Sequence, residues 1–199
     1  MKTKTYPIQR EAIKIAVPDV TQTEDYSCGA AALEAVCKFY GVGKEDDWDY
    51  VRALGMDPRV GSHPFQIRRV AKRYGFHVRD KEKMTLKELR SHLQKRHPVL
   101  LMIQAWGEEK GGKKRRWMES YKDIWSEGHW VVAIGYNRRG IFFEDPSLQA
   151  VRGYIPNNEL DERWHDVGPH NAHFDHFGMA IWKPKFQKNC YTTRAEKIC

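Results

Sequence analysis

The chain has 199 residues, enough for one domain with a hydrophobic core and short for two complete ones. Hydrophobic residues make up 41% and charged residues 30%, a globular composition that does not suggest disorder, and no apolar run approaches the roughly 18 residues of a membrane span. The formal net charge of +8 comes from basic residues scattered among acidic ones, with one dense run at 113–116, and therefore does not favour nucleic-acid binding as the main role.

The N-terminal segment and the cysteines point to a reducing compartment. The first twenty residues lack the uninterrupted apolar core of a secretory signal, so we expect a cytoplasmic protein. Cysteines at positions 28, 37, 190 and 199 form no CxxC pair, which argues against a zinc ribbon and against a disulfide framework. Reduced thiols are the simplest interpretation, and Cys190 and Cys199 would pair only under oxidising conditions.

Residues 25–41 predict an amphipathic helix. Its apolar side chains recur at helical spacing, at Leu33, Val36, Cys37 and Tyr40. Asp25 or Ser27 is placed to cap the start, and Gly41 is placed to end the helix in a left-handed conformation. Cys28 is therefore expected at the N-terminus of this helix.

The middle of the chain alternates predicted helices and strands. A helix starts at Pro64 and closes at Gly75, and residues 76–79 follow as a short strand. Thr85 and Glu88 form a capping box for a helix that stops before Pro98. The apolar run PVLLMIQAW then predicts a strand buried on both faces.

Residues 107–128 are a polar insertion in which Trp117, Tyr121 and Trp125 recur every four residues. This spacing indicates either a small satellite core or a helix that forms a lid or docks a partner over the cleft, with the basic run attracting acidic groups.

Beyond the insertion, most of the chain predicts strands. HWVVAIGY and GIFFEDP predict a hairpin, PNNELDERWHD a helix and FGMAIWKP a last strand. Residues 185–199 form a basic tail that we expect to be loosely attached. With helices first and strands later, the predicted class is α+β: one domain over 1–184, with N-terminal helices packed on a C-terminal antiparallel sheet.

Cys28 is the candidate nucleophile. At a helix N-terminus, exposed N–H groups and the helix dipole stabilise a thiolate over a thiol. The alternative for any free cysteine is a buried structural thiol, as expected for Cys37 in the middle of the same apolar stripe.

His129 and Asp145 are the candidate partners of Cys28. His129 opens the first strand of the predicted hairpin, and Asp145 follows the second strand sixteen residues later, so pairing would bring them together. The carboxylate would hold one imidazole nitrogen and support the imidazolium formed on proton transfer. Each residue also has a plain alternative, a packing histidine and an Asp-Pro turn.

Gln22 lies six residues before Cys28. Its amide could join the Cys28 backbone N–H in an oxyanion hole, where one donor contributes roughly 3 kcal/mol to the charge that develops on an attacked carbonyl.

Together these motifs resemble the papain-like fold, and in particular the bacteriocin-processing, double-glycine peptidase family in its stand-alone form. The matching segments are Gln22 with SCGAAAL, then GHWVVAIGY, then EDPS, and the similarity spans roughly residues 17–183, including PNNELDERWHD. The transporter-linked members carry membrane and ATP-binding domains that this chain lacks, and the 107–128 insertion has no recognised counterpart.

The resemblance implies a cysteine peptidase that acts on a peptide or protein substrate without a cofactor, with catalytic residues Cys28, His129, Asp145 and Gln22. The same residues would serve an acyltransferase or a glutamine deamidase. A catalytically silent peptide-binding domain ranks third because Cys28 is present. The oligomeric state stays open.

His170, His173 and His176 recur every three residues, with Asp175 between them. Without cysteines or a second pair of ligands the pattern is weak, so we interpret it as a polar loop entering the last strand and predict no metal ion.

Overall fold

An eight-stranded sheet organises the fold in the computed structural model. The model describes residues 5–7, 12, 15–44, 46–106, 108–109, 113–114, 120–168, 171–184 and 194–197. From edge to edge the strands are β1 (Thr5–Pro7), β12 (Arg194–Lys197), β8 (Arg152–Pro156), β7 (Gly140–Glu144), β6 (Gly128–Tyr136), β3 (Val99–Gln104), β11 (Gly178–Trp182) and β2 (His77–Lys81). All neighbours pair antiparallel except β12 and β8, which run parallel.

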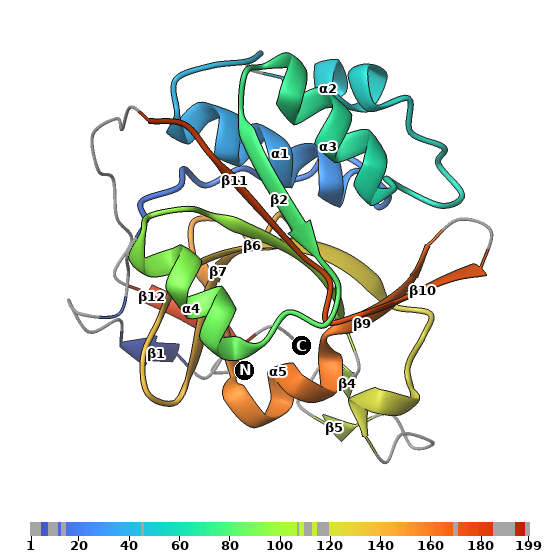
Figure 1. The fold of residues 1–199 in the computed structure, drawn as a ribbon. Coiled ribbons are helices and arrows are strands. Elements are labelled where there is room, and N and C mark those ends of the chain that lie inside the picture. Colours follow the sequence, from blue (N-terminus) through green and yellow to red (C-terminus); the bar gives the residue numbers. More distant parts are fainter. Residues whose placement is uncertain are drawn as a thin grey trace.

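Helices lie on both sides of this sheet (Figure 1). Helices α1 (Cys28–Phe39), α2 (Asp47–Leu54) and α3 (Pro64–Arg73) group together on one side. Helices α4 (Leu86–Gln94) and α5 (Asn157–Arg163) lie on the other. This arrangement confirms the predicted α+β class with N-terminal helices packed on a mainly antiparallel sheet.

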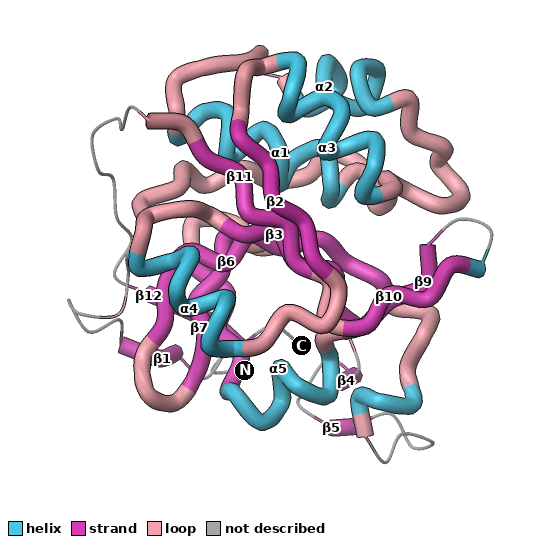
Figure 2. The backbone as a smooth tube through the Cα atoms, viewed as in Figure 1, coloured by secondary structure: helices cyan, strands magenta, loops and turns pink. Residues whose placement is uncertain are grey.

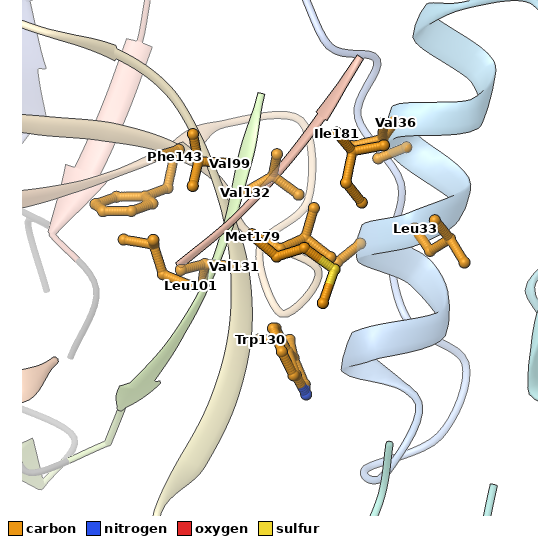
Figure 3. Packing of buried hydrophobic residues seen from close by; sticks show 14 of the residues in the cluster. Leu33, Val36, Val99, Leu101, Trp130, Val131, Val132, Phe143, Met179 and Ile181 are labelled. Atoms are coloured by element: carbon orange, nitrogen blue, oxygen red, sulfur yellow. The ribbon is translucent and has the colours of Figure 1, made fainter. Parts of the chain in front are cut away.

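Helix α1 packs directly on the sheet and fixes where Cys28 lies. Figure 3 shows Val36 of α1 beside Ile181 of β11, with Val132 of β6 in the same layer and Leu33 on the same helix. These side chains are fully buried, as is nearly all of α1, because a helix between the sheet and α2 and α3 has little surface left for solvent. Burying each such aliphatic side chain contributes about 1.5–3 kcal/mol.

Two short two-stranded ribbons and a 3₁₀ turn extend the fold beside the sheet (Figure 2). Strands β9 (His165–Gly168) and β10 (Ala172–Asp175) pair as an antiparallel ribbon. Strands β4 (Glu108–Glu109) and β5 (Lys113–Lys114) form a second, smaller ribbon, and η1 (Tyr121–Asp123) is a single 3₁₀ turn.

Several local predictions are confirmed. Thr85 and Glu88 form the expected capping box, with Thr85 Oγ1 accepting from Glu88 N at 3.2 Å. Gly41 follows α1 with φ of 65°, the left-handed conformation that glycine adopts without a Cβ penalty. Strands β6 and β7 form the predicted hairpin, with a register shift between Ala133 and Gly135, and β3 is buried along its length.

Other local predictions are wrong. Ser27 is the N-cap residue of α1, as one of the two predicted alternatives had it, but the expected side-chain capping bond is absent and its Oγ lies 3.2 Å from Asp47 Oδ2. The helix expected over PNNELDERWHD ends at Arg163, because Trp164 leaves helical geometry and the next residues pair with β10. Helix α2 and strands β8, β9 and β10 were not predicted.

The C-terminal segment also differs from the expectation of a loosely attached tail. Residues Arg194–Lys197 form β12, which pairs with both β8 and β1. Backbone hydrogen bonding is nearly independent of side-chain type, so the polar composition of this segment did not reveal it.

The end of the 107–128 insertion contains the small satellite core that its aromatic spacing suggested, and the lid or docking helix stays a prediction. Tyr121 is buried with Ile124 in a small apolar cluster, and the Arg163 guanidinium lies 3.9 Å from the Tyr121 ring centroid. Trp125 is 43% exposed and lines the cleft described below. Trp117 lies outside the described residues.

In the described part of the chain, no helix combines the length and apolar character required to cross a membrane.

Candidate active site

Cys28 is the first residue of α1, where Gly29 lets the helix approach the wall of a cleft. A Cβ on Gly29 would lie 1.8 Å from Ser62 Oγ and 3.1 Å from Trp130 Cδ1, so only glycine fits without displacing a neighbour. Cys28 is 8% exposed and lines the cleft together with His129. Its backbone N–H donates to no residue that the structure describes.

His129 and Asp145 meet at the end of the β6–β7 hairpin. His129 Nε2 lies 2.7 Å from Asp145 Oδ1, and both side chains are fully buried. The same carboxylate oxygen accepts from the backbone N–H of Ser147 at 2.9 Å and from its hydroxyl at 2.8 Å. Because these bonds hold Nε2, the other ring nitrogen, Nδ1, is the one left for Cys28; it has no hydrogen-bond partner among the described residues.

Opposite charges dominate the electrostatics of this pair. Burial by itself would lower the pKa of His129, but the Asp145 carboxylate and the Cys28 side chain raise it well above the usual range. Burial would raise the pKa of Asp145, but His129 and the Ser147 donors lower it. The pair therefore favours an imidazolium facing a carboxylate.

Gln22 is anchored in the loop before α1. Its backbone N–H donates to Pro146 O at 2.9 Å, next to Asp145, and its Nε2 donates to Glu24 O at 2.8 Å and to Asp25 O at 3.3 Å. Its Oε1 is buried without a partner among the described residues. The amide is thus near the start of α1 but is bonded to its own loop.

An open cleft of about 520 Å³ runs past Cys28 and His129. Its walls come from the loop before α1, the loop of residues 58–62, the start of β6, Trp125 and strand β9. A smaller hollow, lined by Trp106, Gln22 and Pro146, lies on the Gln22 side. Such a groove is open enough to admit an extended chain at Cys28.

The model of the Peptidase C39-like family matches residues 14–171, most of the chain. The chain belongs to the Peptidase C39-like family. Family membership supports cysteine peptidase function, and the predicted resemblance to double-glycine peptidases is confirmed. A comparison with the curated proteins finds no match.

Solved structures show the same fold at low sequence identity. A Bacillus anthracis protein classed as a C39-like peptidase has a TM-score of 0.59 at 16% identity, covering 89% of this chain and all of its own. The peptidase domain of Streptococcus ComA, a bifunctional ABC transporter of a quorum-sensing pathway, has a TM-score of 0.56 at 15% identity, over 81% of this chain and 95% of its own. A double-glycine protease domain from an AMS/PCAT transporter, solved with a leader peptide, has a TM-score of 0.53 at 19% identity, over 88% and 96%.

Sequence reasoning missed four residues around this C39-like site. Trp106 lies over His129 with ring centroids 4.8 Å apart. Asp47 accepts three hydrogen bonds from Thr23 and Ser27, and Gln104 orients Asp166 in the cleft wall. Each comes from an element distant in sequence, and no motif marks it. Asp166 was also missed because the sequence predicted a helix that ends at this residue.

The histidines of the HxxH repeat are engaged elsewhere. His173 lies beside Trp125, with ring centroids 4.8 Å apart, and His176 contacts Asp175 at 2.6 Å and Asp161 at 3.2 Å. His170 lies outside the described residues. Within the residues that the structure describes, no three His, Cys, Asp or Glu side chains group as metal ligands.

Proposed function

We propose that this C39-like protein is a cysteine peptidase in which Cys28 is the nucleophile, His129 its base and Asp145 the residue that orients the histidine. The observation that carries the proposal is the buried 2.7 Å contact between His129 and Asp145, made through Nε2 so that Nδ1 is left for Cys28. A reducing compartment such as the cytoplasm would keep Cys28 in the thiol form that this chemistry needs.

The proposed reaction has two stages. His129 takes the Cys28 proton, the thiolate attacks the carbonyl carbon of the substrate amide, and the proton then passes from His129 to the departing amine. A water molecule, deprotonated by His129, attacks the thioester, and the proton returns to the Cys28 sulfur as the carboxylic acid product leaves.

Two donors are assigned to the oxyanion of the tetrahedral intermediates. The Cys28 backbone N–H is available because it donates to no described residue. The Gln22 amide would release one of its two loop carbonyls and turn to the oxyanion. We expect Gln22 to contribute less than a pre-aimed donor would, because that exchange costs one existing hydrogen bond.

A peptide or protein is the proposed substrate. The cleft is open along the surface and not a closed pocket, which suits an extended chain, and one structural neighbour was solved with a leader peptide bound.

Two cysteines of the same helix provide the test. Cys28→Ala should abolish cleavage of an acetylated hexapeptide library followed by mass spectrometry, whereas Cys37→Ala should keep it. Burial raises the pKa of Cys37 to about 12, so iodoacetamide should alkylate Cys28 and spare Cys37 in the folded protein.

The products decide between the alternatives on this fold. New peptide termini mark a peptidase, a mass increase of a nucleophile adduct marks an acyltransferase, and conversion of glutamine to glutamate marks a deamidase. Persistent cleavage by Cys28→Ala would exclude all three mechanisms.

A further inference from the structure

Asp166 is a buried carboxylate in the wall of the cleft that the proposed mechanism does not use. It lies on β9, is 8% exposed and lines the same cleft as Cys28 and His129. A Cβ on Gly128 would lie 2.4 Å from Asp166 Oδ1 and 2.7 Å from Oδ2, so the carboxylate packs against the backbone immediately before His129.

The two oxygens of Asp166 have different surroundings. Oδ1 accepts from Gln104 Nε2 at 3.0 Å and from the Val167 N–H at 2.8 Å. Gln104 is itself held, since its Oε1 accepts from Glu127 N at 3.0 Å. Oδ2 makes no hydrogen bond to a described residue and is not sealed from the cleft. The structure thus fixes the carboxylate and leaves one oxygen free to accept.

Positive charge in the described cleft wall is already balanced. Its cations are Arg59, whose guanidinium bonds Asp57 at 2.7 Å, and His129, which faces Asp145. Asp25, exposed at the rim, adds a second carboxylate. Above about pH 7, where Asp166 is ionised, its carboxylate and that of Asp25 therefore give the cleft negative charge, which is the electrostatic complement of a cationic ligand.

The apolar and polar lining of the cleft fits a long cationic side chain. Val60 and Trp125 line the cleft and are 53% and 43% exposed, which offers apolar surface for a methylene stem. Ser62 lines the same cleft, with its buried Oγ turned toward Gly29.

We propose that Asp166 selects a substrate with a lysine or arginine side chain seated in the cleft beside His129. This inference rests on the proposed function for its cleavage readout, but its binding readout is independent of catalysis. The ammonium or guanidinium donates to Asp166 Oδ2, a charge-assisted bond that a neutral side chain of the same length cannot form.

The test uses Asp166→Asn, because an amide oxygen can accept from Gln104 and Val167 as Oδ1 does and only the cleft-facing atom changes. The control is Asp161→Asn, an exposed carboxylate on α5 outside the cleft lining. Acetylated and amidated hexapeptide pools carry lysine, arginine, citrulline, norleucine or glutamate at one fixed position. Cleavage rates are measured for each pool, and capture of intact peptides is measured on immobilised Cys28→Ala with and without Asp166→Asn.

Lysine and arginine pools should be preferred over norleucine and citrulline by about ten- to a hundredfold, the effect of one charge-assisted hydrogen bond. Asp166→Asn should remove this preference in both readouts, and Asp161→Asn should keep it. An equal loss of cleavage on all pools would overturn the inference, since it would mean that Asp166 acts on His129. Cleavage without charge preference would overturn it and leave the peptidase standing. Charge-selective capture without any cleavage would leave this inference standing and overturn the proposed peptidase activity.

Discussion

His129 Nε2 and Asp145 Oδ1 are 2.7 Å apart, and neither side chain is exposed. The hairpin of β6 and β7 brings the two residues together although sixteen positions separate them in the chain. Ser147 donates twice to the same oxygen and so fixes the orientation of the carboxylate that faces the histidine. This contact determines which imidazole nitrogen is left for Cys28.

Asp145→Asn should lower kcat/KM on any cleaved peptide by about 10²–10⁴-fold, because an amide cannot stabilise the imidazolium and favours the wrong tautomer. Ser147→Ala is the matched control: it removes one donor from the carboxylate but no charge, so its loss should stay near tenfold. Equal losses for the two variants, with unchanged Tm, would mean that the charge of Asp145 is not what matters.

Asp47→Ala should impair both catalysis and stability. Asp47 Oδ2 accepts from Thr23 N at 3.1 Å, Thr23 Oγ1 at 2.7 Å and Ser27 Oγ at 3.2 Å, and so holds the loop between Gln22 and Cys28. Its removal takes a charged acceptor from Thr23 and from the buried Ser27 hydroxyl, at a cost of about 1–3 kcal/mol in the free energy of unfolding.

Asp46→Ala is the matched control for Asp47→Ala, because it affects helix α2 without removing a contact to the loop. Asp46 caps α2 by accepting from Trp48 N at 3.0 Å, so Asp46→Ala should lose about 1 kcal/mol by denaturant unfolding yet keep kcat. If kcat falls equally in both variants, the effect comes from α2 and not from the loop.

Gly29→Ala should disturb the cleft through Ser62. The new Cβ would lie 1.8 Å from Ser62 Oγ, so the serine and the Trp130 ring beside it must move. We expect a fall in kcat/KM of at least about tenfold. Adding Ser62→Ala removes the clashing atom and should restore most of the activity; a double variant no better than Gly29→Ala would refute this steric account.

Asp166 should make stability depend on pH in a defined direction. Burial raises the pKa of Asp166 from 3.8 to about 7, against the opposing effects of Val167, Gln104 and the His129 charge. Between about pH 4 and 7 the folded protein keeps a proton that the unfolded chain has lost, so the contribution of this group to stability falls as pH rises.

The Asp166→Asn variant has no ionisable group at this position and therefore does not lose this stability as the pH rises. Its free energy of unfolding relative to the wild type should increase between pH 4 and 7 by on the order of 3 kcal/mol and then level off. The ionisable groups around Asp166 include Cys28, His129, His165, His173, Asp175, Asp25 and Arg59, and all are present in both proteins. Parallel pH profiles for the two proteins would contradict the buried carboxylate.

The sequence by itself determined the local parts of the candidate site. The apolar spacing after Cys28 predicted α1, and two apolar runs around residues 137–139 predicted the hairpin that carries His129 and Asp145. These signals are readable because helix and strand periodicity act over a few residues, and a hairpin brings its two ends together with no help from the rest of the chain.

Only the tertiary structure decided which side chains surround those residues. Asp166 reaches the cleft because β9 leaves the predicted helix and packs beside β3, and Asp47 holds the Gln22 loop from a helix that no pattern revealed. Strand β12 joins the sheet through backbone hydrogen bonds, which the sequence of this segment does not predict. Contacts between distant segments depend on how whole elements pack, and a buried polar residue has no periodicity that would mark its partner.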